Sequence, residues 1–233
     1  MELKVENITK KYKRGSRDIY AVNNIEFTAE DGEFNVIVGS SGSGKSTFLN
    51  IIAGLTTPTS GSVTSDDLHI TELSDDAKCN FRNKKVGYIS QERSLLGNLT
   101  VYENVILPYV IGAEPDDKYY DQVEKHAKAL LEELGIEDLK DEYPRNLSGG
   151  ELRRASIARA LINEPKLILA DEPTGELDPE NTKVISKVLR KEAQNGAIVI
   201  LVTHDPSIIQ SGDKVYQMET GRLSYIKELT ETA

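Results

Sequence analysis

The feature that most constrains the fold is a glycine-rich loop between a short apolar run and a helix-like stretch. The run Phe34–Val38 (FNVIV) offers apolar residues to both faces of a strand, which is typical of strands buried in a parallel sheet. It continues into Gly39, Ser40, Ser41, Gly42, Ser43, Gly44, Lys45, Ser46 and Thr47, which match the pattern G-x-x-x-x-G-K-[ST]. The glycines let successive backbone N–H groups turn toward phosphate oxygens, and the helix expected over 45–54 points its positive end at the same anion. We therefore predict a phosphate-binding loop in which Lys45 neutralises the β- and γ-phosphates of ATP and Ser46 offers its hydroxyl to Mg²⁺.

Two further apolar runs, Leu167–Ala170 and Ala197–Val202, also end in residues that carry chemistry. Strand, turn and helix in repetition indicate an open α/β sheet, whose ligands bind beyond the carboxyl ends of the strands. Asp171 follows the first run and suits Mg²⁺ or its water shell, and Glu172 is placed to take a proton from an attacking water. His204 follows the second run, where it can hydrogen-bond the γ-phosphate or orient the water.

The remaining segments predict two additions to this core. Antiparallel strands are expected where apolar and polar residues alternate, over Leu3–Ile8, Ala21–Ala29, Ser62–Ile70 and a hairpin of Lys214–Glu219 with Arg222–Ile226. The stretch Asp116–Leu134 is an amphipathic helix closed by Gly135, and we interpret residues 92–164 as a helical insertion. The basic run is interpreted as a solvated loop that turns at Gly15 and Ser16; its members are Lys10, Lys11, Lys13, Arg14 and Arg17.

Composition excludes several classes of protein. The 38 acidic and 28 basic residues give a formal net charge of −10, which disfavours nucleic acid as a general partner. The longest nearly apolar run, 105–113, is far shorter than the ~18 residues that span a bilayer. The first residues contain no apolar segment typical of a secretory signal, and the single cysteine, Cys79, fits a reducing cytoplasm.

A second glycine motif precedes another helix-like stretch and narrows the interpretation. It consists of Leu147, Ser148, Gly149, Gly150 and Glu151, in which Ser148 is a good N-cap and the glycines permit close backbone approach. This is a second helix N-terminus suited to an anion, one more than a single phosphate-binding loop needs. The motif resembles the signature of ATP-binding cassette (ABC) ATPases, and all the motifs named here occur in that family's order along almost the whole chain.

The resemblance implies a fold and a set of site residues. The fold is α/β, a P-loop NTPase core with a RecA-like, mainly parallel sheet, an antiparallel β subdomain and an inserted α-helical subdomain; residues 1–91 and 165–233 form the core and 92–164 the helical part. Two copies would pair head to tail, so that each ATP lies between the phosphate loop of one copy and the signature, residues 147–151, of the other. Gln91 resembles the family's glutamine that touches Mg²⁺ and links to a membrane partner. Asp178 resembles the family's residue that crosses the dimer interface. Tyr12 resembles the aromatic residue that stacks on adenine, with Tyr20 as the alternative.

The segments Val101–Val105 and Asp171–Asp178 are similar to those of lipoprotein-release and MacB-type exporter ATPases. A separate membrane permease is then the expected partner, and the chain would lie in the cytoplasm, on the inner face of the cell membrane. Either residues 97–111 dock the permease, or they form the core of the helical part. The alternative is an FtsE-like regulatory ATPase that acts on cell-wall remodelling; DNA-repair and translation relatives need more chain than 233 residues. Three residues differ from those usual in the family's motifs: Glu151 stands where Gln is commoner, Ser90 where an aromatic residue is usual, and Glu176 where Asn is frequent. None of these differences removes a catalytic group.

Overall fold

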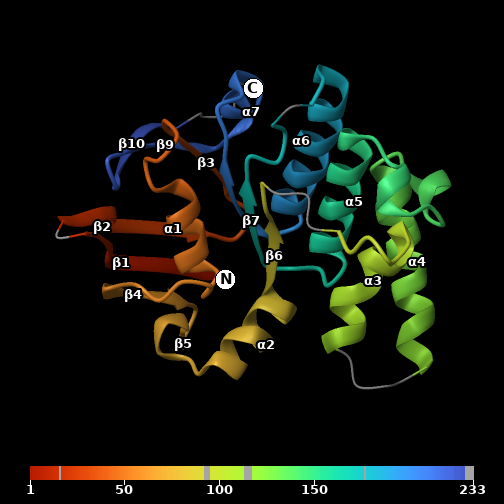
Figure 1. Ribbon diagram of the computed structural model, residues 1–233, viewed down its shortest axis with the longest axis horizontal. Helices are drawn as coiled ribbons and strands as arrows, with labels where there is room; N and C mark the ends of the chain where they lie inside the picture. Colours follow the sequence, from red (N-terminus) through yellow and green to blue (C-terminus); the bar gives the residue numbers. More distant parts are fainter. Residues whose placement is uncertain (16, 92–94, 113–116, 176, 229–233) are drawn as a thin grey trace.

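The computed structural model describes residues 1–15, 17–91, 95–112, 117–175 and 177–228 (Figure 1). A four-stranded antiparallel sheet has the order β2-β1-β4-β5 and comprises β1 (Glu2–Arg14), β2 (Arg17–Glu30), β4 (Ser60–Ser65) and β5 (Leu68–His69). The expected single strand Ser62–Ile70 is wrong, because the chain turns at Asp66 with a φ of 50° and β5 pairs back on β4. The turn places Thr64 and His69 opposite each other on one face of the hairpin, whereas a continuous strand would place them on opposite faces.

A six-stranded sheet of order β10-β9-β3-β8-β7-β6 forms the centre of the molecule. Its strands are β3 (Phe34–Val38), β6 (Val86–Ile89), β7 (Leu167–Asp171), β8 (Ile198–Val202), β9 (Lys214–Glu219) and β10 (Arg222–Glu228). All neighbouring pairs are parallel except β9 with β10, which form the predicted hairpin. The three apolar runs are confirmed as adjacent central strands, and the α/β core is confirmed with them.

Strand β6 and helix α2 (Asp75–Lys85) were not expected from the sequence. Strand β6 is only four residues long and contains Gly87, at which a Cβ would lie 2.6 Å from the Ala160 carbonyl oxygen. Helix α2 has Phe81 as its one buried residue, so it lacks the apolar stripe that would identify it in the sequence. It is defined instead by the cap at Ser74, whose side chain accepts a hydrogen bond from the Ala77 N–H.

The helices fall into two groups. Helices α1 (Lys45–Ile52), α2, α6 (Pro179–Gln194) and α7 (Pro206–Ser211) pack around the central sheet, while α3 (Val101–Gly112), α4 (Asp117–Glu133) and α5 (Gly149–Leu161) lie together on the right in Figure 1. Short 3₁₀ turns occupy Ile70–Glu72, Glu137–Leu139 and Pro144–Asn146. The amphipathic helix is confirmed as α4, which begins at Asp117 and is closed by Gly135 at a φ of 65°. That residues 92–164 form an inserted unit stays a prediction.

The buried residues of β8 show why its sequence is apolar throughout. Ile198, Ile200 and Val202 pack into one core, on one face of the central sheet, with residues of β1, β2 and α1. Val199 and Leu201 pack into a second core, on the other face, with residues of α3 to α6. Both pleat faces are therefore covered, and the carboxyl ends of the strands are the place where polar side chains can gather.

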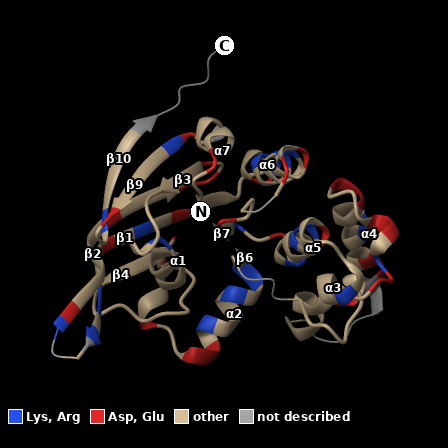
Figure 2. Cartoon of the chain, turned by 45° about the horizontal axis from the view of Figure 1, so that its top comes forward, with Lys and Arg blue, Asp and Glu red and all other residues tan. Residues whose placement is uncertain are grey.

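The basic run is not the loop that the sequence suggested. Lys10, Lys11 and Lys13 lie in β1, and the turn is confined to the region of Gly15, whose φ is 63°. Cross-strand pairing with β2 extends the ladder to the tip of the hairpin, and Lys11 forms an ion pair of 3.2 Å with Asp18. Figure 2 shows blue segments, which mark Lys and Arg, at this end of β1 and β2.

Candidate functional site

A cavity of about 960 Å³ opens at the carboxyl ends of β3, β7 and β8. It brings together the glycine-rich loop, the residues that follow β7 and β8, Gln91 and the start of α5. Its lining consists of Ala21, Gly39, Ser40, Ser41, Gly42, Gly44, Lys45, Ser46, Thr47, Gln91, Gly149, Arg153, Asp171, Glu172, Gly175, Leu177 and His204. Of the nine loop residues, Ser43 is buried and does not line the cavity.

The glycine-rich loop has a backbone that only glycine accommodates at its key position. Gly44 has a φ of 111° and precedes α1, and a Cβ there would lie 1.9 Å from the Ala21 carbonyl oxygen. The Lys45 ammonium group donates hydrogen bonds to the carbonyl oxygens of Gly39 (2.7 Å) and Ser40 (2.8 Å). The loop is thus folded around its own lysine, with the N-terminus of α1 directed at the cavity.

Asp171 and Glu172 stand side by side in sequence but have different surroundings. Asp171 ends β7 and is 6% exposed. Glu172 has a φ of 50°, a strained conformation for a residue other than glycine that costs on the order of 1–3 kcal/mol. Its backbone N–H donates to the Val202 carbonyl oxygen at 2.9 Å, and its Oε2 lies 3.0 Å from Nδ1 of His204. The turn therefore directs the Glu172 carboxylate along the cavity wall to His204.

Beneath the cavity, Tyr88 of β6 donates a hydrogen bond of 2.8 Å from its hydroxyl to the Asn50 Oδ1 on α1. Burial raises the pKa of Tyr88 strongly, and the negative charge of Asp171 raises it further. Tyr88 therefore remains a neutral phenol and ties β6, the strand that leads to Gln91, to the helix that follows the glycine-rich loop.

The signature segment forms a capped helix start. Ser148 is the N-cap of α5, and its Oγ accepts from the Glu151 N–H at 3.4 Å, while Glu151 Oε2 accepts from the Ser148 N–H at 2.6 Å. Hydrogen bonding of the Glu151 carboxylate by the Ser148 side chain, and next by the Ser148 backbone N–H, lowers the pKa of Glu151. Gly149 borders the cavity; Leu147, Ser148, Gly150 and Glu151 are not among its lining residues.

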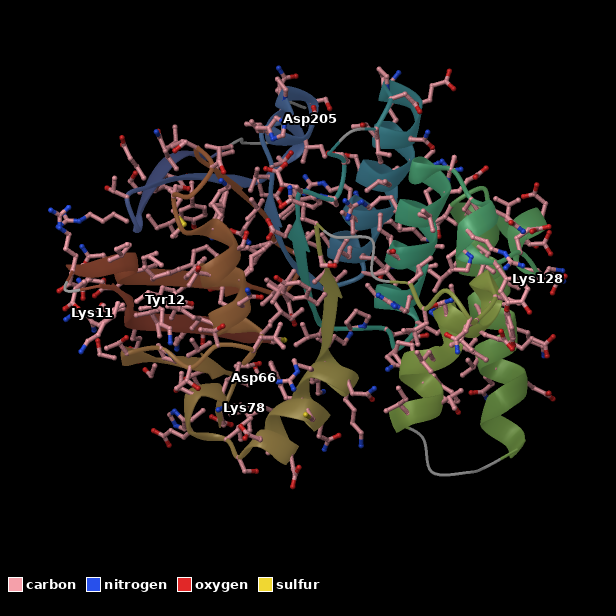
Figure 3. All side chains as sticks on the ribbon, in the orientation of Figure 1. Lys11, Tyr12, Asp66, Lys78, Lys128 and Asp205 are labelled. Atoms are coloured by element: carbon pink, nitrogen blue, oxygen red, sulfur yellow. The ribbon has the colours of Figure 1, made fainter. Side chains whose placement is uncertain are left out.

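The remaining predicted residues lie outside the cavity lining. Tyr12 and Tyr20 are 45% and 44% exposed, on the hairpin of β1 and β2, and Figure 3 labels Tyr12 there. Each ring has a lysine ammonium about 5 Å from its centroid, Lys10 at 5.2 Å from Tyr12 and Lys11 at 5.0 Å from Tyr20. Both rings have the same kind of environment, so the adenine-stacking role stays a prediction for Tyr12, with Tyr20 as its alternative.

Asp178 is the N-cap of α6. Its Oδ1 accepts from the backbone N–H groups of Asn181 (2.9 Å) and Glu180 (3.0 Å), and these bonds, with Asn181 foremost, lower the pKa of Asp178. Its predicted place at a dimer interface stays a prediction. Glu176 lies outside the described residues.

The segment 97–111 contains both buried and exposed apolar residues, and its docking to a permease stays a prediction. Val101 and Val105 are fully buried in the core, whereas Val110 and Ile111, at the end of α3, are 41% and 73% exposed. Among the described residues no helix has the length and apolar character needed to cross a membrane.

Two residues that hydrogen-bond the backbone near the site, Arg153 and Asn104, were not predicted from the sequence. Arg153 of α5 is 7% exposed and donates to the carbonyl oxygens of Ser90 and Gln91. Asn104 of α3 is fully buried and hydrogen-bonds the loop that precedes the helix. In the sequence, each of these two residues is recognisable only as a polar residue on an otherwise apolar helix face. That pattern does not identify the backbone groups that the side chain would hydrogen-bond.

Comparison with known proteins was made on this basis. The family model described as "ABC transporter" matches residues 22–175. The dimeric MJ0796, described as a bacterial ABC transporter cassette, superimposes with a TM-score of 0.92 at 36% identity, covering 98% of this chain and 99% of that one. A dimeric post-hydrolysis state of MJ0796, bound to ADP and Pi, gives a TM-score of 0.91 with the same identity and coverage. A nucleotide-free ATP-binding cassette from an ABC transporter gives 0.82 at 25% identity, covering 98% of this chain and 92% of that one.

Proposed function

Because the chain belongs to the ABC transporter family and is an ATPase of the cassette type, we propose that it is the subunit that powers a separate membrane permease. The observation that carries the proposal is the cavity that joins the glycine-rich loop with Asp171, Glu172 and His204. These groups come from three separate segments of the chain. Their common location supports a site for nucleotide hydrolysis rather than for binding alone.

We assign the roles by position in the cavity. Lys45, now bonded to two loop carbonyls, would transfer its hydrogen bonds to the β- and γ-phosphates of ATP, which are stronger charged acceptors. Glu172 would accept a proton from the attacking water, and His204 at 3.0 Å would fix the carboxylate and contact the γ-phosphate. Tyr12, or Tyr20 in its place, would stack on the adenine from the hairpin whose residue Ala21 borders the cavity.

The same cavity fits Mg²⁺ when it is shared with a nucleotide. Ser46, Gln91 and Asp171 contribute hydroxyl, amide and carboxylate oxygens to its lining, the ligand types that Mg²⁺ prefers. Within the described part of the chain no group of three or more acidic, histidine or cysteine side chains could hold a metal alone. Ser46, Gln91 and Asp171 would therefore hold Mg²⁺ together with the nucleotide's phosphates, and the bound ion would supply charge neutralisation there.

A second copy of the chain would complete the site. MJ0796 is dimeric in its solved structures, and Gly149, at the capped N-terminus of α5, lines the cavity. We propose a head-to-tail dimer in which residues 147–151 of each copy contact the ATP held by the other, and Asp178 lies at the interface. Release of phosphate would remove contacts that both copies share, and the dimer would open.

The permease would bind at α3, where Val110 and Ile111 expose apolar surface on the group of helices that follows Gln91. The resemblance of Val101–Val105 and Asp171–Asp178 to exporter ATPases supports lipoprotein, peptide or macrolide cargo. The chain would then lie in the cytoplasm, peripherally on the membrane. An FtsE-like regulatory role uses the same cassette, so a cell-wall phenotype on deletion of the gene, without loss of export, would favour that alternative.

Two variants test the shared site. Lys45→Ala should lose ATP affinity in titration calorimetry, because it removes a charge-assisted contact to phosphate. Ser148→Arg should keep the monomer's ATP affinity, because its own glycine-rich loop is intact, but should not form the ATP-dependent dimer in size exclusion. The bulky cation would occupy the place where the partner's γ-phosphate meets the helix N-terminus.

Mixing the two variant proteins gives the decisive measurement. One site of the mixed dimer carries both lesions, while the other combines an intact glycine-rich loop with an intact signature. Hydrolysis should reappear in the mixture although neither variant is active alone, and each variant mixed with itself is the control. Loss of ATP binding by monomeric Ser148→Arg would instead place the signature at its own nucleotide and contradict the proposal.

A further inference from the structure

The residue that joins the start of α5 to Gln91 is Arg153. Its Nη1 donates to the Ser90 carbonyl oxygen at 2.5 Å and its Nη2 to the Gln91 carbonyl oxygen at 2.7 Å. The side chain is 7% exposed and lines the same cavity as Gln91 and Gly149. A planar guanidinium is the side chain that can hold two successive carbonyls at once, and it remains charged at every physiological pH.

The α5 end of this link is a capped helix start. Arg153 lies four residues beyond Gly149, so about 6 Å of α-helix separates these two residues. The capping box of Ser148 and Glu151 fixes this helix start. A shift of the Ser90 and Gln91 carbonyls is therefore passed to the N-terminus of α5 as a movement of the helix.

The segment beyond Gln91 is also anchored. Asn104 of α3 holds the backbone of Leu96 through its N–H at 2.7 Å and its carbonyl at 3.0 Å. Gln91 is thus fastened to α5 through Arg153, and Leu96, which lies beyond residues 92–94, is fastened to α3 through Asn104. Movement of the Gln91 carbonyl would be passed to α5 through Arg153.

We infer that Arg153 is a positioning residue that couples the two ATP sites of the proposed dimer. The inference rests on the proposed function, in which Gln91 senses the nucleotide of its own copy and Ser148 contacts the nucleotide of the partner. Arg153 is the short path between these two contacts within one chain. Occupancy of the first site then sets the position of the signature that closes the second.

The test uses the full chain with Arg153→Gln and Arg153→Lys. Arg153→Gln removes the charge and cannot hold both carbonyls, whereas Arg153→Lys keeps the charge but offers a single point donor. Lys128→Gln is the control, because it removes one positive charge from α4 at a side chain that is 61% exposed and does not line the cavity. Figure 3 labels Lys128 at the right of the molecule. Thermal melting shows whether each variant is folded, and calorimetry with Mg-ADP reports binding to the single chain.

The readout that a merely structural role would not change is the Hill coefficient of hydrolysis against ATP concentration. For two coupled sites its upper limit is about 2. We expect a value above 1 for the parent and for Lys128→Gln, a value near 1 for Arg153→Gln and an intermediate value for Arg153→Lys. The Mg-ADP affinity of each variant, measured on the single chain, separates a loss of nucleotide binding from a loss of coupling, because weaker binding alone shifts the ATP concentration at half-maximal rate and leaves the Hill coefficient unchanged.

Hydrogen exchange gives a second readout that does not depend on turnover. Nucleotide binding should slow exchange at the start of α5 in the parent and in Lys128→Gln, but not in Arg153→Gln. A parent Hill coefficient of 1, or an Arg153→Gln protein that retains both the parent's Hill coefficient and its protection of α5, would overturn the inference. If the proposed function itself were wrong, other measurements would show it: Lys45→Ala would keep its ATP affinity, or Ser148→Arg would still form the ATP-dependent dimer.

Discussion

Replacing Asn104 by alanine should destabilise the loop that precedes α3. The Asn104 amide is fully buried and accepts from the Leu96 N–H at 2.7 Å. It also donates to the carbonyl oxygens of Leu96 (3.0 Å), Leu99 (3.1 Å) and Thr100 (2.9 Å). One side chain thus organises the whole loop, and alanine removes every one of these contacts.

The size of the stability loss depends on which of these backbone groups keep another hydrogen-bond partner in the variant. The Leu96 carbonyl still accepts from the Leu99 N–H at 3.2 Å, and the Thr100 carbonyl from the Asn104 N–H at 3.0 Å. The loss therefore falls mainly on the Leu96 N–H and the Leu99 carbonyl. Leu96 is 46% exposed and Leu99 is half-buried, so water can reach part of both groups and each lost hydrogen bond costs about 1 kcal/mol. We therefore expect the free energy of unfolding to fall by about 2 kcal/mol, which for a chain of 233 residues lowers the melting temperature by roughly 4–8 °C.

Urea denaturation and thermal melting measure the change, with Asn83→Ala as the matched control. Asn83 lies on α2 and its side-chain amide donates one hydrogen bond, to the Pro108 carbonyl at 2.7 Å, so its loss should cost about 1 kcal/mol. ATP affinity should be unchanged in both variants, because neither side chain lines the cavity. If Asn104→Ala were no less stable than Asn83→Ala, the argument that Asn104 organises the loop would be refuted.

Three further perturbations follow from the site. Glu172→Gln should keep ATP binding and trap the dimer while slowing turnover by about 10²–10⁴-fold, measured as phosphate release; turnover at the parent rate would remove Glu172 from its role. Gly44→Ala should abolish nucleotide binding, because the new Cβ would lie 1.9 Å from the Ala21 carbonyl oxygen; calorimetry on the folded variant would show intact affinity if the loop could adjust. The hydrogen bonds from Ser148 lower the pKa of Glu151, so the charged carboxylate stabilises the fold above about pH 4.5, and this stability is lost as the pH falls through the lowered pKa. The difference in unfolding free energy between the parent and Glu151→Gln should therefore disappear in acid. A constant difference from about pH 7 to about pH 3 would contradict the capping role.

The sequence by itself determined the parts of this protein whose chemistry is local. The central strands were identifiable because burial on both faces requires apolar residues at every position, as in Ile198–Val202. The glycine-rich loop was identifiable because its backbone path requires glycine at Gly44 and its charge is supplied by the next residue, Lys45. The amphipathic periodicity of the sequence predicted α4, and the cap residue Ser148 of the signature motif, which ends in Glu151, indicated the start of α5.

Only the tertiary structure decided how these parts meet. Strand β6 and helix α2 have weak local patterns because their stability comes from neighbours, such as the carbonyl of Ala160 packed against Gly87. The basic hairpin is a strand because pairing with β2 overrides the local preference of a charged segment for a loop. Arg153 and Asn104 bind backbone atoms, which every residue possesses, so no sequence pattern could reveal their partners; those contacts exist only because the fold brings α3 and α5 beside the chain around Gln91.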